Sequence, residues 1–148
     1  MGSLISKLQD IIGRIRTTRS EPACDPIVIS TEDELLSFIQ EHPLLEEIRT
    51  KVVGVSFPND DGSSRQAILS NCRRGDYITL ESYRFHGQRA YAVFTEHGQI
   101  GNLSANLAKR LEREYSDDFI ASGTISSITG GSGGLYYGCN IFLRIYQA

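Results

Sequence analysis

Apolar residues at the start of the chain recur at helical spacing, with charged residues between them. This pattern is typical of an amphipathic helix, and it predicts one over residues 1–16. We expect residues 4–15 to dock on the chain's own domain or on a second copy of the chain. A partner helix or a membrane surface are the alternatives. The apolar stripe consists of Leu4, Ile5, Leu8, Ile11, Ile12 and Ile15.

Residues 17–26 carry two prolines and several turn-forming residues, which is typical of a linker. The apolar residues that follow predict a short strand at 27–30. Thr31 stands three residues before Glu34 and ahead of an apolar run, and this spacing predicts a capped helix. We therefore expect residues 27–50 to form a short strand and a helix that lead into the main domain.

From residue 51 onward the apolar positions fall into short runs with a period of two, which is typical of strands. Ser63 with Gln66 predicts the start of one short helix, and Ser104 predicts the start of a second. Most strands are not separated by a helix-sized crossover, so residues 51–148 predict a mainly β (α+β) domain, a small six-stranded barrel with two short helices. The expected strands lie at 51–57, 77–83, 90–96, 99–104, 119–128 and 136–146.

The charge of the chain is close to neutral. Its 148 residues suffice for one compact domain with an appendage, and the formal net charge is −3. Residues 1–50 hold 5 basic and 9 acidic side chains, whereas residues 51–148 hold 10 basic and 9 acidic ones. A general coat for nucleic acid is therefore excluded, and contact with DNA or RNA would need a local basic patch.

The residues that usually carry metal or acid–base chemistry are scattered. Cys24, Cys72 and Cys139 lie far apart without metal-ligand spacing, so we expect no metal, no cofactor and no disulfide framework. No apolar run reaches the roughly 20 residues of a membrane span, and a cytoplasmic, reduced protein without an integral membrane segment is predicted. Carboxylate pairs lie in turn-forming segments, so we expect no catalysis.

Three arginines crowd the segment between residues 63 and 80. Arg73 and Arg74 are expected in the last turn of a helix, where cations are favoured. Arg65 lies on the apolar edge of that helix, where it must either pair with acceptors of the fold or reach a groove. We favour the structural pairing, and the role of Arg65 stays open at this point.

The stretch SYRFHGQRAY, residues 82–91, interleaves aromatic and cationic side chains. Single-stranded nucleic acid is held by stacked bases and cationic groups along the backbone, so this segment is a candidate binding surface. The alternative is a strand–turn–strand hairpin whose Tyr83 and Tyr91 cover the sheet while its arginines are solvated. The candidate residues of this segment are Tyr83, Arg84, Phe85, His86 and Arg89.

The order of several motifs resembles the HIRAN domain, in its small stand-alone bacterial form, over about residues 51–148. The similar stretches are VVGVSF, RQAIL followed by RRGDYITLESY, RAYAVFTEHGQIGNLSANLAKRL, and ITGG with GCNIFLRI. The resemblance implies an OB-like barrel that binds single-stranded DNA, in some members at a free 3′ end. It implies an aromatic contact at Phe57, a pocket position near His86 and a polar contact at Asn102. Gly87 stands where the family carries an acidic residue for the terminal sugar.

Two functions follow as expectations, and a third rests on analogy. The first is a non-catalytic module that binds single-stranded DNA on a face containing Phe57, Arg84, His86 and Arg89. The second is a protein-interaction or dimerisation module that acts through the N-terminal helix. A third, by analogy alone, is an accessory to a helicase or nuclease in trans.

Overall fold

The computed structural model describes residues 16–19, 27–28, 31–116 and 118–148. The predicted amphipathic stripe at 4–15, Cys24 and most of the predicted linker lie outside the described residues. The elements are β1 Arg16–Arg19, β2 Ile27–Val28, α2 Glu32–Glu41, β3 Leu44–Lys51, α3 Arg65–Ser70, β4 Tyr77–Phe85, β5 Gln88–Thr95, β6 Gly98–Asn102, α4 Ala105–Tyr115, β7 Phe119–Thr129 and β8 Gly138–Gln147.

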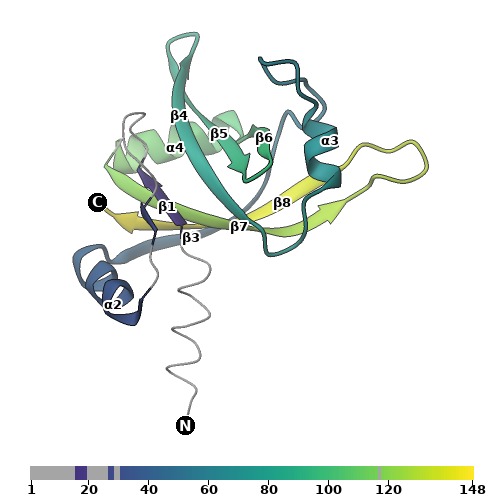
Figure 1. Cartoon of the computed structure of the whole chain (residues 1–148). Coiled ribbons are helices and arrows are strands. Elements are labelled where there is room, and N and C mark those ends of the chain that lie inside the picture. The colour runs from purple at the N-terminus through teal and green to yellow at the C-terminus, as the bar shows by residue number, and fades with distance from the viewer. Residues whose placement is uncertain (1–15, 20–26, 29–30, 117) are drawn as a thin grey trace.

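The described strands form one antiparallel sheet in the order β2-β1-β7-β4-β5-β6, with β8 also pairing β7 and β3 pairing β8. Figure 1 shows β4 curving across the sheet from the β4–β5 hairpin to the connection with α3. A single isolated bridge, Val53 with Asn102, joins the chain after β3 to the edge strand β6. The chain is therefore mainly β, and the described strands are not closed into a barrel by a continuous ladder. Of the six strands predicted within residues 51–148, five are present as β4–β8, because the strand expected at 51–57 is absent. The described sheet has eight strands because β1, β2 and β3 precede them.

Alternation along the strands separates a buried face from an outer face. Leu80 of β4 lies opposite Val93 of β5, and Ile78 lies opposite Gly123 of β7. Ile78, Leu80 and Val93 pack with the inward residues of β7 and β8. Helix α4 lays an apolar stripe over one end of this core, and Ser104 caps it by accepting a hydrogen bond from the backbone N–H of Leu107 at 3.2 Å, as predicted. Burying this stripe is what holds α4, because a helix of 11 residues is marginal by itself.

The strand predicted at 51–57 is wrong. Strand β3 runs from Leu44 to Lys51 and pairs along β8, so the sheet extends to both sides of the predicted domain start at residue 51. Gly54 has φ +72° and its carbonyl accepts from the N–H of Phe57, which turns the chain out of the sheet. The apolar alternation of this segment therefore leaves Phe57 exposed.

Three further expectations need correction. The N-cap of α3 is Ser64, and Gln66 makes no capping box but bonds the backbone of Val55 and Tyr137. Arg73 and Arg74 lie beyond α3, which ends at Ser70. The first three residues of the predicted linker, 17–19, and the last residue of the predicted helix, Arg16, form β1, which pairs with β2 and β7. The capping role of Thr31 in α2 is confirmed, since its side chain accepts from the N–H of Glu34.

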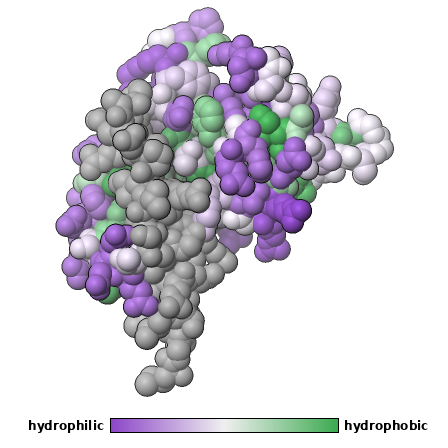
Figure 2. Space-filling view, in the orientation of Figure 1, coloured by the Kyte–Doolittle hydropathy of each residue, from purple (hydrophilic) through white to green (hydrophobic). Residues whose placement is uncertain are grey.

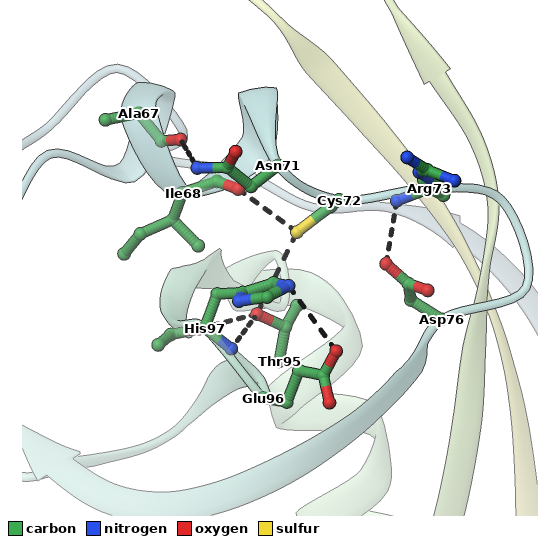
Figure 3. A network of polar contacts seen from close by, with 10 residues as sticks. Ala67, Ile68, Asn71, Cys72, Arg73, Asp76, Thr95, Glu96 and His97 are labelled. Carbon is green, nitrogen blue, oxygen red and sulfur yellow. Dashed lines mark hydrogen bonds and ion pairs between the residues drawn. The ribbon is translucent and has the colours of Figure 1, made fainter.

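Helix α3 is tied to the turn between β5 and β6 by a small polar network (Figure 3). The Cys72 thiol donates to the carbonyl of Ile68 at 3.2 Å and lies 3.9 Å from the Thr95 hydroxyl. Asp76 accepts from the backbone N–H of Arg73 at 2.7 Å and closes the turn before β4. This network holds α3, and with it Arg65, beside β6, where Ile68 and Leu69 join the buried core.

Candidate nucleic-acid interface

A groove of about 590 Å³ lies on the outer face of β4, β5 and β6. Its second wall is the connection between β3 and α3, which Figure 1 shows rising beside the β4–β5 hairpin. The space-filling view shows hydrophobic and hydrophilic side chains mixed over this part of the surface (Figure 2). The lining residues are Phe57, Asp60, Arg65, Glu81, Ser82, Tyr83, Phe85, Ala92, Phe94, Gln99 and Asn102. Throughout, we refer to this feature as the aromatic groove.

Strand alternation determines which hairpin residues reach the aromatic groove. Tyr83 and Phe85 of β4 share the outer face, since inward positions of that strand are buried in the core. Ala92 lies opposite both Glu81 and Asn102, and its small side chain leaves space at the base of the groove. Phe57 is 65% exposed, Phe85 61% and Tyr83 38%, so three aromatic rings are available to a ligand.

Gly54 brings the opposite wall close to the floor. A Cβ atom at this position would lie 3.2 Å from Arg65 Nη1, 3.5 Å from Phe57 Cδ2 and 3.6 Å from Asn102 Nδ2. A guanidinium, an aromatic ring and an amide therefore surround one point of the backbone. A side chain there would be strained by the positive φ and would crowd all three groups.

The sequence left open whether Arg65 pairs within the fold or reaches a groove, and the structure shows that it does both. Its Nε donates to Asn59 Oδ1 at 2.7 Å, and its Nη1 donates to the carbonyl of Gly54 at 2.8 Å. The favoured structural pairing is thus present, and the same side chain also lines the aromatic groove. Because a guanidinium has five N–H donors, these two bonds leave donors for an incoming ligand.

The tyrosine of the groove floor is held by a short hydrogen bond. Tyr83 Oη donates to Asn102 Oδ1 at 2.6 Å. Burial raises the pKa of Tyr83, Arg65 lowers that pKa and Asp60 raises it. The phenol is therefore a neutral donor, and its bond to Asn102 directs the amide nitrogen of Asn102 toward Gly54.

The predicted site is split between two faces of the hairpin. Arg84 and Arg89 are cross-strand partners and, by alternation, lie on the face opposite Tyr83 and Phe85. Arg84 Nη1 lies 3.7 Å from Glu112 Oε1 of α4 and donates to the carbonyl of Gly87. Neither arginine lines the aromatic groove. The expectation of one face containing both the arginines and the aromatics is therefore wrong.

The turn of the hairpin holds His86 away from the groove lining. His86 has φ +51° and Gly87 φ +78°, the two positive values that a two-residue hairpin turn needs. The His86 ring packs edge-on against Phe85, with ring centroids 4.2 Å apart. The hairpin alternative is thus confirmed in shape, but Tyr83 and Tyr91 lie on opposite faces and only Tyr91 is fully buried.

Sequence reasoning placed Phe57, Tyr83, Phe85 and Asn102 in the site, and the structure brings these four together. It missed Phe94 and Gln99, which the pairing of β5 with β6 places in the groove lining. It also left the role of Arg65 open. The position of Arg65 on an apolar helix edge was the available signal. Two carboxylates, Asp60 and Glu81, also line the groove and were not expected there.

The chain matches no protein-family model, no curated protein and no solved structure. The described residues contain no group of three or more His, Cys, Asp or Glu side chains that could hold a metal ion. In the same residues no helix has the length and apolarity to cross a membrane. The features that bear on function are therefore the groove and its chemistry.

Proposed function

We propose that the protein is a non-catalytic binding module for single-stranded DNA, with the bases held in the aromatic groove. The observation that carries this proposal is that three exposed rings, Phe57, Tyr83 and Phe85, line one groove together with Arg65. Exposed aromatic rings on a soluble sheet are costly to hydrate unless a ligand covers them. Stacking on such rings is worth about 1–3 kcal/mol per base and tolerates any sequence.

The charges of the groove favour bases over phosphates on its floor. Glu81 and Asp60 would repel a phosphate placed between the walls, whereas carboxylates accept hydrogen bonds from the amino groups of bases. Arg65 can stack on a base or bond its edge acceptors. The strand then lies with its bases inward and its backbone toward the solvent side of the groove.

The proposal also includes recognition of a free 3′ end of the DNA strand. Asn102 and Tyr83 supply an amide and a phenol at the floor, which suit a sugar hydroxyl. Gly87 lies in the hairpin turn and does not line the groove, so the acidic contact that the HIRAN resemblance implies has no counterpart at this position. The HIRAN and OB-like assignments belong to the same proposal, supported by motif order and by the Val53–Asn102 approach.

The test is a titration of the full chain into labelled single strands, one with a free and one with a blocked 3′-hydroxyl, at two salt concentrations. Phe57→Ala should weaken binding about 5- to 150-fold, the loss of one stacked base. Tyr136→Ala is the matched control, because Tyr136 is 69% exposed and does not line the groove.

Equal weakening by Phe57→Ala and Tyr136→Ala, or no binding at low salt, would refute the proposal. The blocked strand tests recognition of the 3′ end: weaker binding supports it, and equal binding assigns a general single-strand groove. In the absence of any binding, the interaction module formed by residues 4–15 becomes the function to examine.

A further inference from the structure

A second groove, of about 360 Å³, lies on the outer face of β3, β8 and β7. It is lined by Arg49, Arg74 and Arg144 around Phe142, together with Thr124 and Ser126. We call it the cationic groove. Figure 2 shows strongly hydrophilic side chains projecting beneath the connection between α3 and β4, the segment that contains Arg74.

Two of the arginines are held in place by one ring. Arg49 of β3 lies directly opposite Phe142 of β8, and Arg144 follows two residues later on the same face. The Cζ atoms of Arg49 and Arg144 lie 5.5 Å and 5.1 Å from the centroid of the Phe142 ring. Cation–π contact orders both guanidinium groups without using their N–H donors, so the donors remain available to a ligand.

Among the described residues, the arginines of the cationic groove have no acidic partner at ion-pair distance. In the part of the chain that the structure describes, no carboxylate lies within 4.0 Å of the guanidinium groups of Arg49, Arg74 or Arg144. Glu47 is the cross-strand neighbour of Arg144 and makes no ion pair with it. Three cations that have no ion-pair partner among the described residues repel one another, and a bound anion relieves that repulsion.

The two grooves are joined along the outer face of the sheet. Thr124 of the cationic groove pairs with Tyr77 of β4, and Glu81 of the aromatic groove follows four residues later on the same face of that strand. Four residues of strand span about 13 Å. A strand of nucleic acid that leaves the aromatic groove can therefore reach the arginines of the cationic groove.

The two grooves are also chemically complementary. The aromatic groove carries three exposed rings and a single arginine beside two carboxylates, which suits bases but neutralises no phosphate. The cationic groove carries three arginines, two hydroxyl side chains and one ring already covered by guanidinium groups. Arginine forks match the oxygens of a phosphodiester, and hydroxyl groups add donors.

We propose that the cationic groove binds the phosphodiester backbone of the same single strand whose bases occupy the aromatic groove. This inference rests on the proposed function. It predicts that the site is larger than the aromatic groove and that much of the salt dependence of binding originates at Arg49, Arg74 and Arg144.

The test compares a strand of about 4 nucleotides with one of about 12, which bracket the usual range of such sites. Arg49→Ala combined with Arg144→Ala should weaken binding of the long strand about tenfold at low salt. The slope of log K against log salt should become shallower by about 1.4, or about 0.7 for each lost contact. The short strand should bind equally to both forms of the protein.

Arg113→Ala is the matched control, since Arg113 is an exposed arginine of α4 that lines neither groove. An unchanged thermal midpoint of the double variant shows that the sheet is intact. If the double variant leaves the long-strand affinity and slope unchanged while Phe57→Ala still weakens binding, the inference is wrong and the proposed function stands. If Phe57→Ala has no effect, or no strand binds, both proposals are overturned.

Discussion

The two faces of the β4–β5 hairpin carry neighbouring residues with opposite surroundings. On the outer face, Tyr83 and Phe85 line a groove and remain exposed to a ligand. On the other face, Arg84 points toward α4 and lies 3.7 Å from Glu112. Residues that alternate in the sequence are thus separated by the thickness of a sheet.

The comparison shows why an interleaved motif is a weak indicator of a shared surface. A cation and an aromatic side chain at adjacent strand positions cannot contact the same ligand group, because successive side chains point to opposite faces. The cation that does join the aromatic rings, Arg65, comes from a helix that lies 18 residues before Tyr83 in the chain. Tertiary packing, and not local order, brings cation and ring together.

The largest effect is expected from a substitution that disrupts the groove side of the hairpin and leaves the side facing α4 unchanged. In Gly101→Ala the new Cβ would overlap the carbonyl oxygen of Val53, so the bridge between Val53 and Asn102 cannot form unchanged. We expect the free energy of unfolding to fall by about 3 kcal/mol, as for an overpacked site. Denaturant unfolding measures this loss.

Gly133→Ala serves as the control for Gly101→Ala, because a Cβ at Gly133 meets no atom within 4 Å. Its cost should be limited to the strain of a positive φ, about 1 kcal/mol. Equal destabilisation by the two substitutions would show that the approach of Val53 to β6 contributes nothing to stability.

Alanine substitutions at the adjacent residues Tyr83 and Arg84 test the two faces separately, with a smaller expected effect. Tyr83→Ala should weaken binding of single-stranded DNA about 5- to 150-fold, because it removes a ring from the aromatic groove. Arg84→Ala should leave the affinity within about twofold and lower the free energy of unfolding by at most about 1 kcal/mol, as expected for an exposed ion pair. Fluorescence anisotropy and denaturant unfolding separate the two outcomes. A larger loss of affinity for Arg84→Ala would reverse the assignment of the faces.

The smallest effect concerns the attachment of α4, the helix behind the second face. Tyr115 Oη donates to Glu46 Oε2 at 2.6 Å, which raises the pKa of Tyr115 from 10.0 to about 12. A raised pKa favours the protonated form in the folded state, so this contribution is intact below pH 10 and is lost as the pH rises toward 12. Tyr115→Phe should cost about 1 kcal/mol at neutral pH.

At acidic pH the same contact loses its contribution to stability as the pH falls, the opposite of its behaviour at alkaline pH. The hydrogen bond from Tyr115 lowers the pKa of Glu46, burial raises that pKa, and Arg110 lowers it through a 2.7 Å contact. The stability contributed by Glu46 is therefore present above its ordinary pKa of 4.5 and is lost as the pH falls through the lowered value. Tyr115→Phe should flatten both limbs of the pH–stability profile, and an unchanged profile would contradict this account.

Local patterns predicted the elements whose causes are local. Thr31 and Ser104 cap helices where the sequence indicates. The same reasoning failed at residues 51–57, where an apolar alternation typical of a strand lies in a turn. The turn at Gly54 and the pairing of the preceding residues with β8 override the local preference.

The sequence by itself determined the class of the protein. Its period of two, its capped helices and its turn residues specify a mainly β chain, because burial of one strand face and satisfaction of helix ends are local requirements. The interleaved stretch at 82–91 also indicated Tyr83 and Phe85, and the HIRAN resemblance indicated Phe57 and Asn102.

Only the tertiary structure decided which of these groups meet. Arg65 reaches the rings of β4 through three tertiary features. These are the pairing of β3 with β8, the bridge from Val53 to Asn102 and the position of α3. The same pairing brings Arg49 and Arg144 to the ring of Phe142. These contacts join residues far apart in the chain, and their geometry depends on strand register, which is selected by burial of the whole sheet.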